Sequence, residues 1–371
     1  MSILFTSSDG CIISHIDYLN DIYKNVDLDG KIRKLKFKDD FFKINSQFLR
    51  QNQIKNVNEV EKDQRPPRKK MKKVQSLPEN LQEQNNFVKI IGERILNSAS
   101  ELQILKKMAV DHNEEARLAS KNFFLNEICL SHQFCGSNSR DLPVVAEYSN
   151  EKFVFPANSK FYSYDIRSIR QSFQIDDHFD LILLDPPWWN KSIRRKNVKF
   201  KEGSYKMLRN EEIEQIPIGQ LLNPTGIVAV WCTNNITQMK SILEQIFPTW
   251  GVSMKGKWYW LKISQNCEPI CDFGTNHGKQ PYEQIIFATL SSNTQLNLPQ
   301  DKVIVSVPSA VHSHKPPLSE ILSPYLPEKP KCLEIFARYL LPNWTSCGLE
   351  VLKFQRLSLF TMMDQEQFEE N

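Results

Sequence analysis

The chain has 371 residues, of which 40% are hydrophobic and 24% are charged, and its formal net charge is +4. This composition is ordinary for a soluble globular protein, and the length allows one catalytic domain with an accessory one. A net charge this small excludes a protein-wide positive field, so any affinity for nucleic acid has to come from local patches. No apolar run reaches transmembrane length, and residues 1–9 lack the basic-then-apolar form of a signal peptide, so we expect a soluble intracellular protein with no membrane partner.

The eight cysteines are scattered and form no Cys-x-x-Cys pair. Cys267 and Cys271 are the closest two, and no second pair of cysteines or histidines completes a zinc site. A disulfide framework is not expected in a chain this long, so reduced thiols fit better. We therefore predict no structural metal and a location in the nucleus or the cytoplasm.

The part of the chain before residue 142 is predicted to form three segments. Residues 1–50 are predicted to be a small accessory region, because a Ser-Ser-Asp-Gly turn separates two short apolar runs. Residues 51–84 are predicted to be a disordered linker, whose basic cluster at 65–73 is either a nuclear localisation signal or RNA-phosphate contact, or simply solvated. Residues 85–141 are predicted to be helical, because apolar side chains recur there at helical spacing.

Residues 142–356 are predicted to be the catalytic domain, and residues 357–371 a frayed tail. Apolar and aromatic runs in this domain alternate with amphipathic stretches, so an α/β fold is expected. We expect strands at 153–155, 161–164, 181–184, 227–231, 257–263, 283–290, 302–307 and 332–338, and helices at 210–217, 236–247 and from 319.

The run from Leu181 to Trp188 is the strongest single feature of the sequence. Its four apolar residues predict a strand buried on both faces, and Pro186 and Pro187 end that strand because proline cannot donate to a ladder. Asp185 and Trp188 then lie beyond the carboxyl end of the strand, which is where open parallel α/β sheets bind ligands. The sequence therefore predicts a binding site here.

These residue types suit a flat base that carries an exocyclic amine. Trp188 would stack on the base, while Asp185 and the Pro186 carbonyl accept the two amine hydrogens and turn the nitrogen lone pair toward an electrophile. The simpler alternative is a strand-to-turn exit capped by an aspartate. A given four-residue string of this kind occurs by chance in about one chain in a thousand, judged by average residue usage, which favours the functional interpretation.

The run Asp185-Pro-Pro-Trp-Trp-Asn-Lys-Ser192 resembles the adenine-N6 methyltransferases of the MT-A70 family, in the branch called methyltransferase-like protein 4. His-Ser-His-Lys-Pro-Pro at 312–317, Leu-Glu-Ile-Phe-Ala-Arg at 333–338 and Pro-Asn-Trp at 342–344 resemble the same family and occur in its order. The resemblance covers roughly residues 143 to 356. It implies a Rossmann-like S-adenosylmethionine-dependent methyltransferase domain in a permuted order, in which the substrate-amine motif precedes the cofactor motif.

The same resemblance implies which residues hold S-adenosylmethionine. Lys315 would pair with the methionine carboxylate of the cofactor, Asp165 would contact its adenine end, and Arg338 would reach its ribose. The alternatives are a helix cap for Asp165 and a surface salt bridge for Arg338. The full set implied at the cofactor is Asp165, Ile166, Asp185, Lys315, Phe336, Arg338 and Glu350.

The segment after Trp188 is predicted to contact nucleic acid. Lys191, Arg194 and Arg195 adjoin the predicted base pocket and would bind the flanking phosphates, although a basic run can also be a solvated face. Trp189 stands where many relatives have an acidic residue, and it is either a second stacking surface or a wall of the pocket.

One position departs from the family in a way that bears on catalysis. Leu349 stands where relatives commonly have an asparagine that hydrogen-bonds the cofactor, and the lost bond would cost about 1 kcal/mol. We predict N6-methylation of adenosine in RNA, and the branch implies an internal 2′-O-methyladenosine of a spliceosomal small nuclear RNA. DNA adenine is the alternative substrate, and a non-catalytic protein that binds RNA or a partner is the alternative of a different class. The sequence leaves a protein partner and the oligomeric state open.

Overall fold

The structure is a computed structural model that describes residues 2–48, 78–102, 112–126, 130, 133–169, 177–189, 207–274, 280–293 and 298–363. Residues 51–77 of the predicted linker and the predicted nucleic-acid contacts Lys191, Arg194 and Arg195 lie outside these described residues, as does the end of the predicted tail at 364–371. Within the described part of the chain no helix is long and apolar enough to cross a bilayer.

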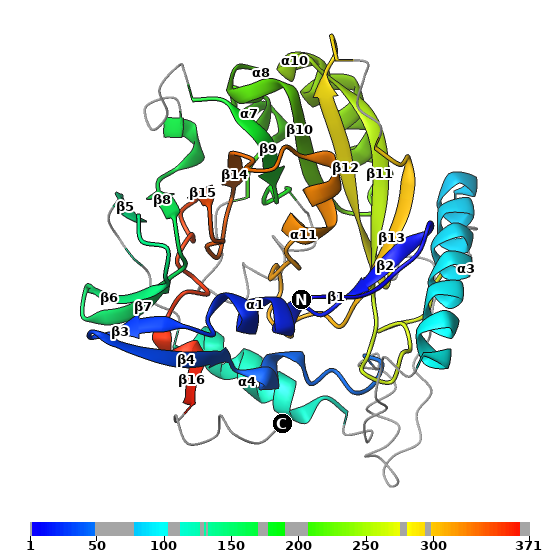
Figure 1. The fold of residues 1–371 in the computed structure, drawn as a ribbon. Helices are drawn as coiled ribbons and strands as arrows, with labels where there is room; N and C mark the ends of the chain where they lie inside the picture. The colour runs from blue at the N-terminus through cyan, green and yellow to red at the C-terminus, as the bar shows by residue number, and fades with distance from the viewer. Residues whose placement is uncertain are drawn as a thin grey trace, which may run out of the picture.

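The described chain is built on one large sheet and one small sheet (Figure 1). The large sheet contains, in spatial order, β1 (Ile3–Thr6), β2 (Gly10–Ile13), β13 (Asp301–Ser306), β11 (Val252–Lys262), β12 (Tyr282–Leu290), β10 (Leu222–Cys232), β9 (Phe179–Leu184), β14 (Cys332–Ile335), β15 (Trp344–Cys347), β8 (Ser159–Ser163) and β5 (Phe134–Asn138). The run from β10 through β9, β14 and β15 to β8 is parallel, and β12 is antiparallel to both of its neighbours. Five parallel carboxyl ends therefore lie along one edge of the sheet.

Both faces of the large sheet are buried, as the apolar runs predict. In β10, Val228 and Val230 pack in one apolar cluster, and Ala229 and Trp231 pack in another on the opposite face. One face is covered by α3 (Glu79–Glu101), α7 (Asn210–Glu214), α8 (Ile218–Leu221), α9 (Ile236–Ser241), the π turn η3 (Ile242–Ile246) and α10 (Phe247–Trp250). The other is covered by α1 (His15–Ile22), α11 (Ser319–Leu322) and the 3-10 turn η1 (Asp39–Phe42).

The small sheet joins segments that are far apart in the sequence. Its order is β16 (Phe360–Met363), β4 (Lys31–Phe37), β3 (Val26–Leu28), β6 (Val144–Tyr148) and β7 (Glu151–Phe155). The helix α4 (Glu114–Leu125) packs near it through η1, and short 3-10 turns lie at η2 (Ile166–Ser168), η4 (Ser323–Tyr325) and η5 (Leu357–Leu359).

The structure divides the ends of the chain differently from the sequence prediction. The predicted accessory region 1–50 is shared between the two sheets, because β2 pairs in parallel with β13 while β4 joins the small sheet. Residues 360–363 of the predicted tail form β16 against β4. Strand pairing between distant segments leaves no local signal in the sequence, since each short strand is specified by the partner it meets.

Candidate active site

Asp185 lies at the carboxyl end of β9, between the parallel strands β10 and β14. The four residues before it are 0–2% exposed, which confirms the predicted buried strand. The diproline then bends the backbone, and the Pro186 carbonyl accepts the N–H of Trp188 at 2.8 Å. One lone pair of that carbonyl is therefore already used, and only the second is left for the predicted amine.

Three segments of the chain meet at the Asp185 carboxylate. Lys315 Nζ donates to Asp185 Oδ1 at 2.9 Å and to Oδ2 at 3.0 Å, and a guanidinium nitrogen of Arg338 donates to Oδ2 at 2.7 Å. The two cations are 130 and 153 residues away from Asp185 in the sequence, and all three side chains are buried. The structure thus brings together three of the residues that the sequence predicts at the site.

The ion pairs continue on both sides of this group. Lys315 also contacts Glu283 Oε2 at 3.3 Å, and Glu283 pairs with Lys262. Arg338 Nε contacts Glu350 Oε2 at 3.2 Å, and Glu350 Oε1 accepts from Lys353 at 2.7 Å. The result is an alternating row of cations and anions, which we call the charged row; in order it contains Lys262, Glu283, Lys315, Asp185, Arg338, Glu350 and Lys353.

The sequence interpretation missed Glu283, Lys262 and Lys353. A signal for the first two exists in hindsight: Lys262 ends the apolar strand β11 and Glu283 stands near the start of β12. Because β11 and β12 are antiparallel, both charges fall at the same edge of the sheet as Asp185.

The pairing decides the protonation of the charged row. Burial by itself lowers the pKa of the Lys315 ammonium, but Asp185 and Glu283 outweigh it and hold that pKa above its ordinary value. Burial by itself raises the pKa of Glu283, yet the charges of Lys262 and Lys315 hold it well below its ordinary range. Lys315 and Glu283 therefore both stay ionised near neutral pH.

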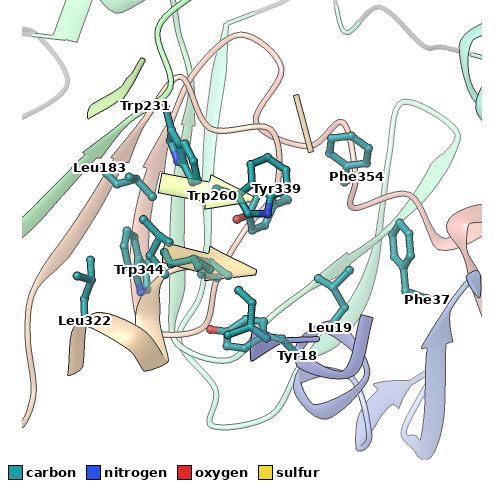
Figure 2. Close-up of a cluster of buried hydrophobic side chains, with 14 of the residues drawn as sticks. Tyr18, Leu19, Phe37, Leu183, Trp231, Trp260, Leu322, Tyr339, Trp344 and Phe354 are labelled. Carbon is teal, nitrogen blue, oxygen red and sulfur yellow. The ribbon is translucent and has the colours of Figure 1, made fainter. Parts of the chain in front are cut away.

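Two tryptophan rings lie beneath the lysines of the row. The Lys315 ammonium is 5.4 Å from the ring centre of Trp231, and the Lys262 ammonium is 4.5 Å from that of Trp260. Figure 2 shows the two rings next to each other; their centres are 5.6 Å apart and their planes meet at 69°. Cation–π attraction adds to the ion pairs and fixes where the two ammonium groups stand.

The two tryptophans of the central motif differ in exposure. Trp188 is 8% exposed, packs on the face of the sheet opposite Trp231, and donates its indole N–H to the Trp231 carbonyl at 2.9 Å. Trp189 is 40% exposed. The sequence predicts that a base stacks on Trp188. Here the Trp188 ring is hydrogen-bonded to β10 and only a small part of it reaches solvent, so stacking by Trp188 stays a prediction.

The other residues predicted at the cofactor follow the next strands of the sheet. Asp165 follows β8 and accepts the N–H of Arg167, so the predicted helix cap is confirmed at η2, and Ile166 is buried. Phe336 follows β14 with a φ of +67°, a backbone conformation that non-glycine residues seldom adopt. Glu350 follows β15, and its neighbour Leu349 is 56% exposed, so the leucine points out of the core.

A second buried acid, Glu334, lies one strand away from Asp185. It stands opposite Leu183 and Ser346 in the ladder, it is 5% exposed, and its Oε2 has no hydrogen-bond partner among the described residues. Burial, together with the negative charge of Asp185, raises the pKa of Glu334 to about 8. The sequence interpretation gave this residue no role.

The two histidines of the 312–317 loop do not act together. His312 is exposed, while His314 is buried against His15, with ring centres 4.4 Å apart, and stacks on Phe354 at 3.9 Å. Among the described residues no group of three or more histidine, cysteine, aspartate or glutamate side chains is placed to hold a metal ion.

The fold and this site define an α/β protein with an acid, two prolines and a tryptophan at the carboxyl end of a central parallel strand. Residues 179–350 match the MT-A70 family model. The chain is 34% identical over 261 residues to human N(6)-adenine-specific methyltransferase METTL4. The aligned region covers 68% of this chain and 52% of the human protein. It is 34% identical over 302 residues to the N6-methyladenosine RNA methyltransferase MTA1 of Cryphonectria parasitica, covering 80% and 84% of the two chains. The Caenorhabditis elegans DNA N6-methyl methyltransferase is 29% identical over 94% of this chain and 97% of its own length.

The chain belongs to the MT-A70 family, in its METTL4 branch. The predicted resemblance is thereby confirmed. The chain spans about half the length of the human and mouse METTL4 proteins that it matches.

Proposed function

We propose that this protein transfers a methyl group from S-adenosylmethionine to N6 of an adenosine in RNA, and that its target is an internal 2′-O-methyladenosine of a spliceosomal small nuclear RNA. The observation that carries the proposal is the meeting of Lys315 and Arg338 at Asp185, directly before the diproline and Trp188. The names of the human and Cryphonectria relatives support the N6-adenine chemistry and, for the second, the RNA substrate.

The residues present fit the cofactor. Asp165, Glu350, Phe336 and Asp185 follow β8, β15, β14 and β9, which are consecutive parallel strands, so they form a row along one edge of the sheet. Adjacent strands lie about 4.8 Å apart, so this row spans about 14 Å. The row has an acid for the adenine end at Asp165, an acid for ribose hydroxyls at Glu350, and a cation for the methionine carboxylate at Lys315.

The strand order supports a permuted Rossmann-like arrangement. The cofactor motif on β14 comes 148 residues after Leu184 in sequence numbering (332 against 184), yet β14 lies directly beside β9. A parallel pair can be formed by segments in either chain order, because the ladder depends only on their adjacency in space. We propose that the site is the methyltransferase cofactor edge with the two motifs exchanged along the chain.

Asp185 would position the amine of the base. When bound, S-adenosylmethionine supplies an electrophilic methyl group on a sulfonium. Asp185 and the free lone pair of the Pro186 carbonyl accept the amine hydrogens, so the nitrogen lone pair faces that methyl group. The amine cannot be reached inside a duplex, so the base enters single-stranded or flipped.

Nucleic-acid contacts are proposed from the exposed side of the motif. Trp189 is exposed and offers a stacking surface, and Lys191, Arg194 and Arg195 follow it in the sequence. We further propose a location in the nucleus, with the basic cluster at 65–73 as the signal; deletion of that cluster should move a fluorescently tagged protein to the cytoplasm.

A side-by-side methylation assay tests the proposal. RNA, RNA with a 2′-O-methylated target adenosine, and single-stranded DNA of one sequence are incubated with labelled cofactor, with Asp185→Ala as the inactive control. Label on the 2′-O-methylated RNA above the other two supports the stated substrate. Preference for DNA would instead support the second candidate, which the Caenorhabditis elegans relative favours by its name.

A non-catalytic binding role is the alternative of a different class, and Leu349 is the observation in its favour. An exposed leucine at a position where relatives have a cofactor-binding asparagine gives no hydrogen bond. Calorimetric titration separates the two roles: a scaffold shows no heat of binding at millimolar S-adenosylmethionine, whereas an enzyme does.

A further inference from the structure

The acceptor that the substrate amine needs is already in use. Asp185 is 8% exposed, and its two oxygens receive three charged hydrogen bonds, two from Lys315 and one from Arg338. A carboxylate offers about four acceptor positions, so little of its capacity is left. The one acceptor position left lies on a buried carboxylate beside two cations, so an adenine amine has to compete with at least one of them to donate to Asp185.

A neutral amine is a poor competitor for that position. Hydrogen bonds between ionised groups are stronger than those from a neutral N–H, and removing one partner from a buried ion pair leaves an uncompensated charge. A second carboxylate is different, because Lys315 or Arg338 can turn from Asp185 to a new anion and remain paired throughout. The site therefore admits an anionic ligand more readily than a neutral one.

Each cation also has a second acid on its far side. Lys315 is 3.3 Å from Glu283, and Arg338 is 3.2 Å from Glu350. Either cation can thus leave Asp185 without losing all of its charge compensation. One additional anion next to the charged row would therefore allow a cation to leave Asp185.

We propose that the protein binds its ligands in a compulsory order, in which a carboxylate-bearing ligand must first draw Lys315 or Arg338 away from Asp185 before the adenine amine can bind there. This inference rests on the proposed function, and the ligand that supplies the carboxylate is the amino-acid end of S-adenosylmethionine or its demethylated product. The sugar–phosphate backbone can still bind beforehand, because the contacts proposed for it, at Trp189 and the basic residues after it in the sequence, do not include Asp185. Only recognition of the amine waits for the cofactor.

The test measures amine recognition by binding and not by turnover. Two fluorescent RNA oligonucleotides differ only at the target, which is adenosine in one and purine riboside, which lacks the amine, in the other. Their Kd values are measured by anisotropy without cofactor, with S-adenosylhomocysteine, and with 5′-methylthioadenosine, which lacks the carboxylate. We expect a Kd ratio near one without cofactor and with methylthioadenosine, and a preference for adenosine of about fivefold with S-adenosylhomocysteine, the size of one or two hydrogen bonds. An equal preference in all three conditions would overturn the compulsory order.

Two lysine variants sharpen the result. Lys315→Met removes two of the three bonds to Asp185, so the preference for adenosine should appear without any cofactor. Lys302→Met is the matched control, because Lys302 also lies over a tryptophan ring, that of Trp258, but is not part of the charged row. It should keep the wild-type dependence on S-adenosylhomocysteine. If a variant does not fold, as judged by circular dichroism, the wild-type ligand series still decides.

The two levels of the argument fail separately. Methyl transfer to any adenosine oligonucleotide, combined with a cofactor-independent preference, overturns the binding order and leaves the proposed function standing. Absence of transfer to RNA and DNA alike overturns both.

Discussion

His314 and Lys315 are adjacent in one loop, but their ionisable side chains are buried in two different surroundings. Lys315 points into the charged row, where each ion has an oppositely charged neighbour. His314 points into an aromatic box, where His15, Phe354, Tyr339, Phe37 and Phe42 surround its ring. Among the described residues the ring nitrogens of His314 and His15 have no hydrogen-bond partner.

The difference shows what burial does to an ionisable group. In the charged row the neighbours outweigh burial, and the pKa of Lys315 stays above its ordinary value. In the aromatic box no described residue supplies an opposite charge, so burial lowers the pKa of His15 to about 3 and that of His314 well below its ordinary value. The charge of His15 adds to the lowering at His314. Side chains in the charged row therefore stay ionised and the histidines of the aromatic box stay neutral, although Lys315 and His314 are adjacent in the sequence.

Removal of the central anion should break the charged row most severely. Asp185→Ala leaves Lys315 and Arg338 without their shared partner, which should cost about 3–5 kcal/mol in the free energy of unfolding. Methyl transfer should fall at least about 100-fold. Urea unfolding and a labelled-cofactor assay measure the two effects. The sequence alone predicts lost turnover with an intact fold; the two buried cations add the stability cost.

A control for this change lies on the same strand. Asp180 accepts from Asn223 Nδ2 at 2.6 Å and from the backbone N–H of Lys331 at 2.8 Å, and neither donor is a buried cation. Asp180→Ala should therefore cost less than Asp185→Ala. Equal losses would contradict the role given to charge pairing.

Glu334 tests the edge of the charged row, because it is a buried acid on which burial and the charge of Asp185 outweigh the charges of Arg338 and Lys315. Its folded pKa of about 8 lies above its unfolded value of 4.5, so the unfolded state releases a proton first and stability falls as pH rises from 4.5 through 8. Glu334→Gln cannot ionise, so the wild type should lose up to about 3 kcal/mol relative to this variant between pH 5 and 7. Chemical denaturation at both pH values measures it, with Glu147→Gln as an exposed control; parallel pH profiles would contradict the assignment.

His15 tests the aromatic box with the opposite pH dependence. Its folded pKa of about 3 lies below the ordinary 6.5, so the unfolded state takes up a proton first and stability falls as pH drops below 6.5. His15→Phe should remove this effect and lose about 2 kcal/mol less than the wild type between pH 7 and 5. His112→Phe, at an exposed position, is the control. If both variants follow the wild-type acid profile, the box does not hold a neutral histidine.

The smallest effect is expected at Trp188, the tryptophan that follows the diproline. Trp188→Phe loses the indole N–H bond to the Trp231 carbonyl, which should cost about 1 kcal/mol for the hydrogen bond. Trp258→Phe loses a similar bond, to the Pro299 carbonyl at 2.8 Å, outside both the motif and the charged row. Both should melt at similar temperatures, and only Trp188→Phe should also impair methyl transfer. Impairment by neither would remove Trp188 from the proposed site.

The sequence was sufficient to locate the centre of the site, but not its geometry. The four apolar residues before Asp185 specify a doubly buried strand, and two prolines must end it, so the position of the acid follows from local rules. Lys315 and Arg338 were predicted only through the family resemblance, and then as cofactor ligands. That both contact Asp185 in this structure is a result of strand order, which brings β14 to β9 and the loop after β13 over the same edge.

The tertiary structure alone decided which residues are buried together. Glu334 lies within the Leu-Glu-Ile-Phe-Ala-Arg run at 333–338, but its raised pKa arises from its place between β9 and β15. His15 and His314 are 299 positions apart in the sequence, and only the folded structure brings their two rings into contact. Hydrophobic periodicity is a local property of the sequence. The electrostatic state of a side chain depends instead on the charges and the solvent around it, which only the folded structure supplies.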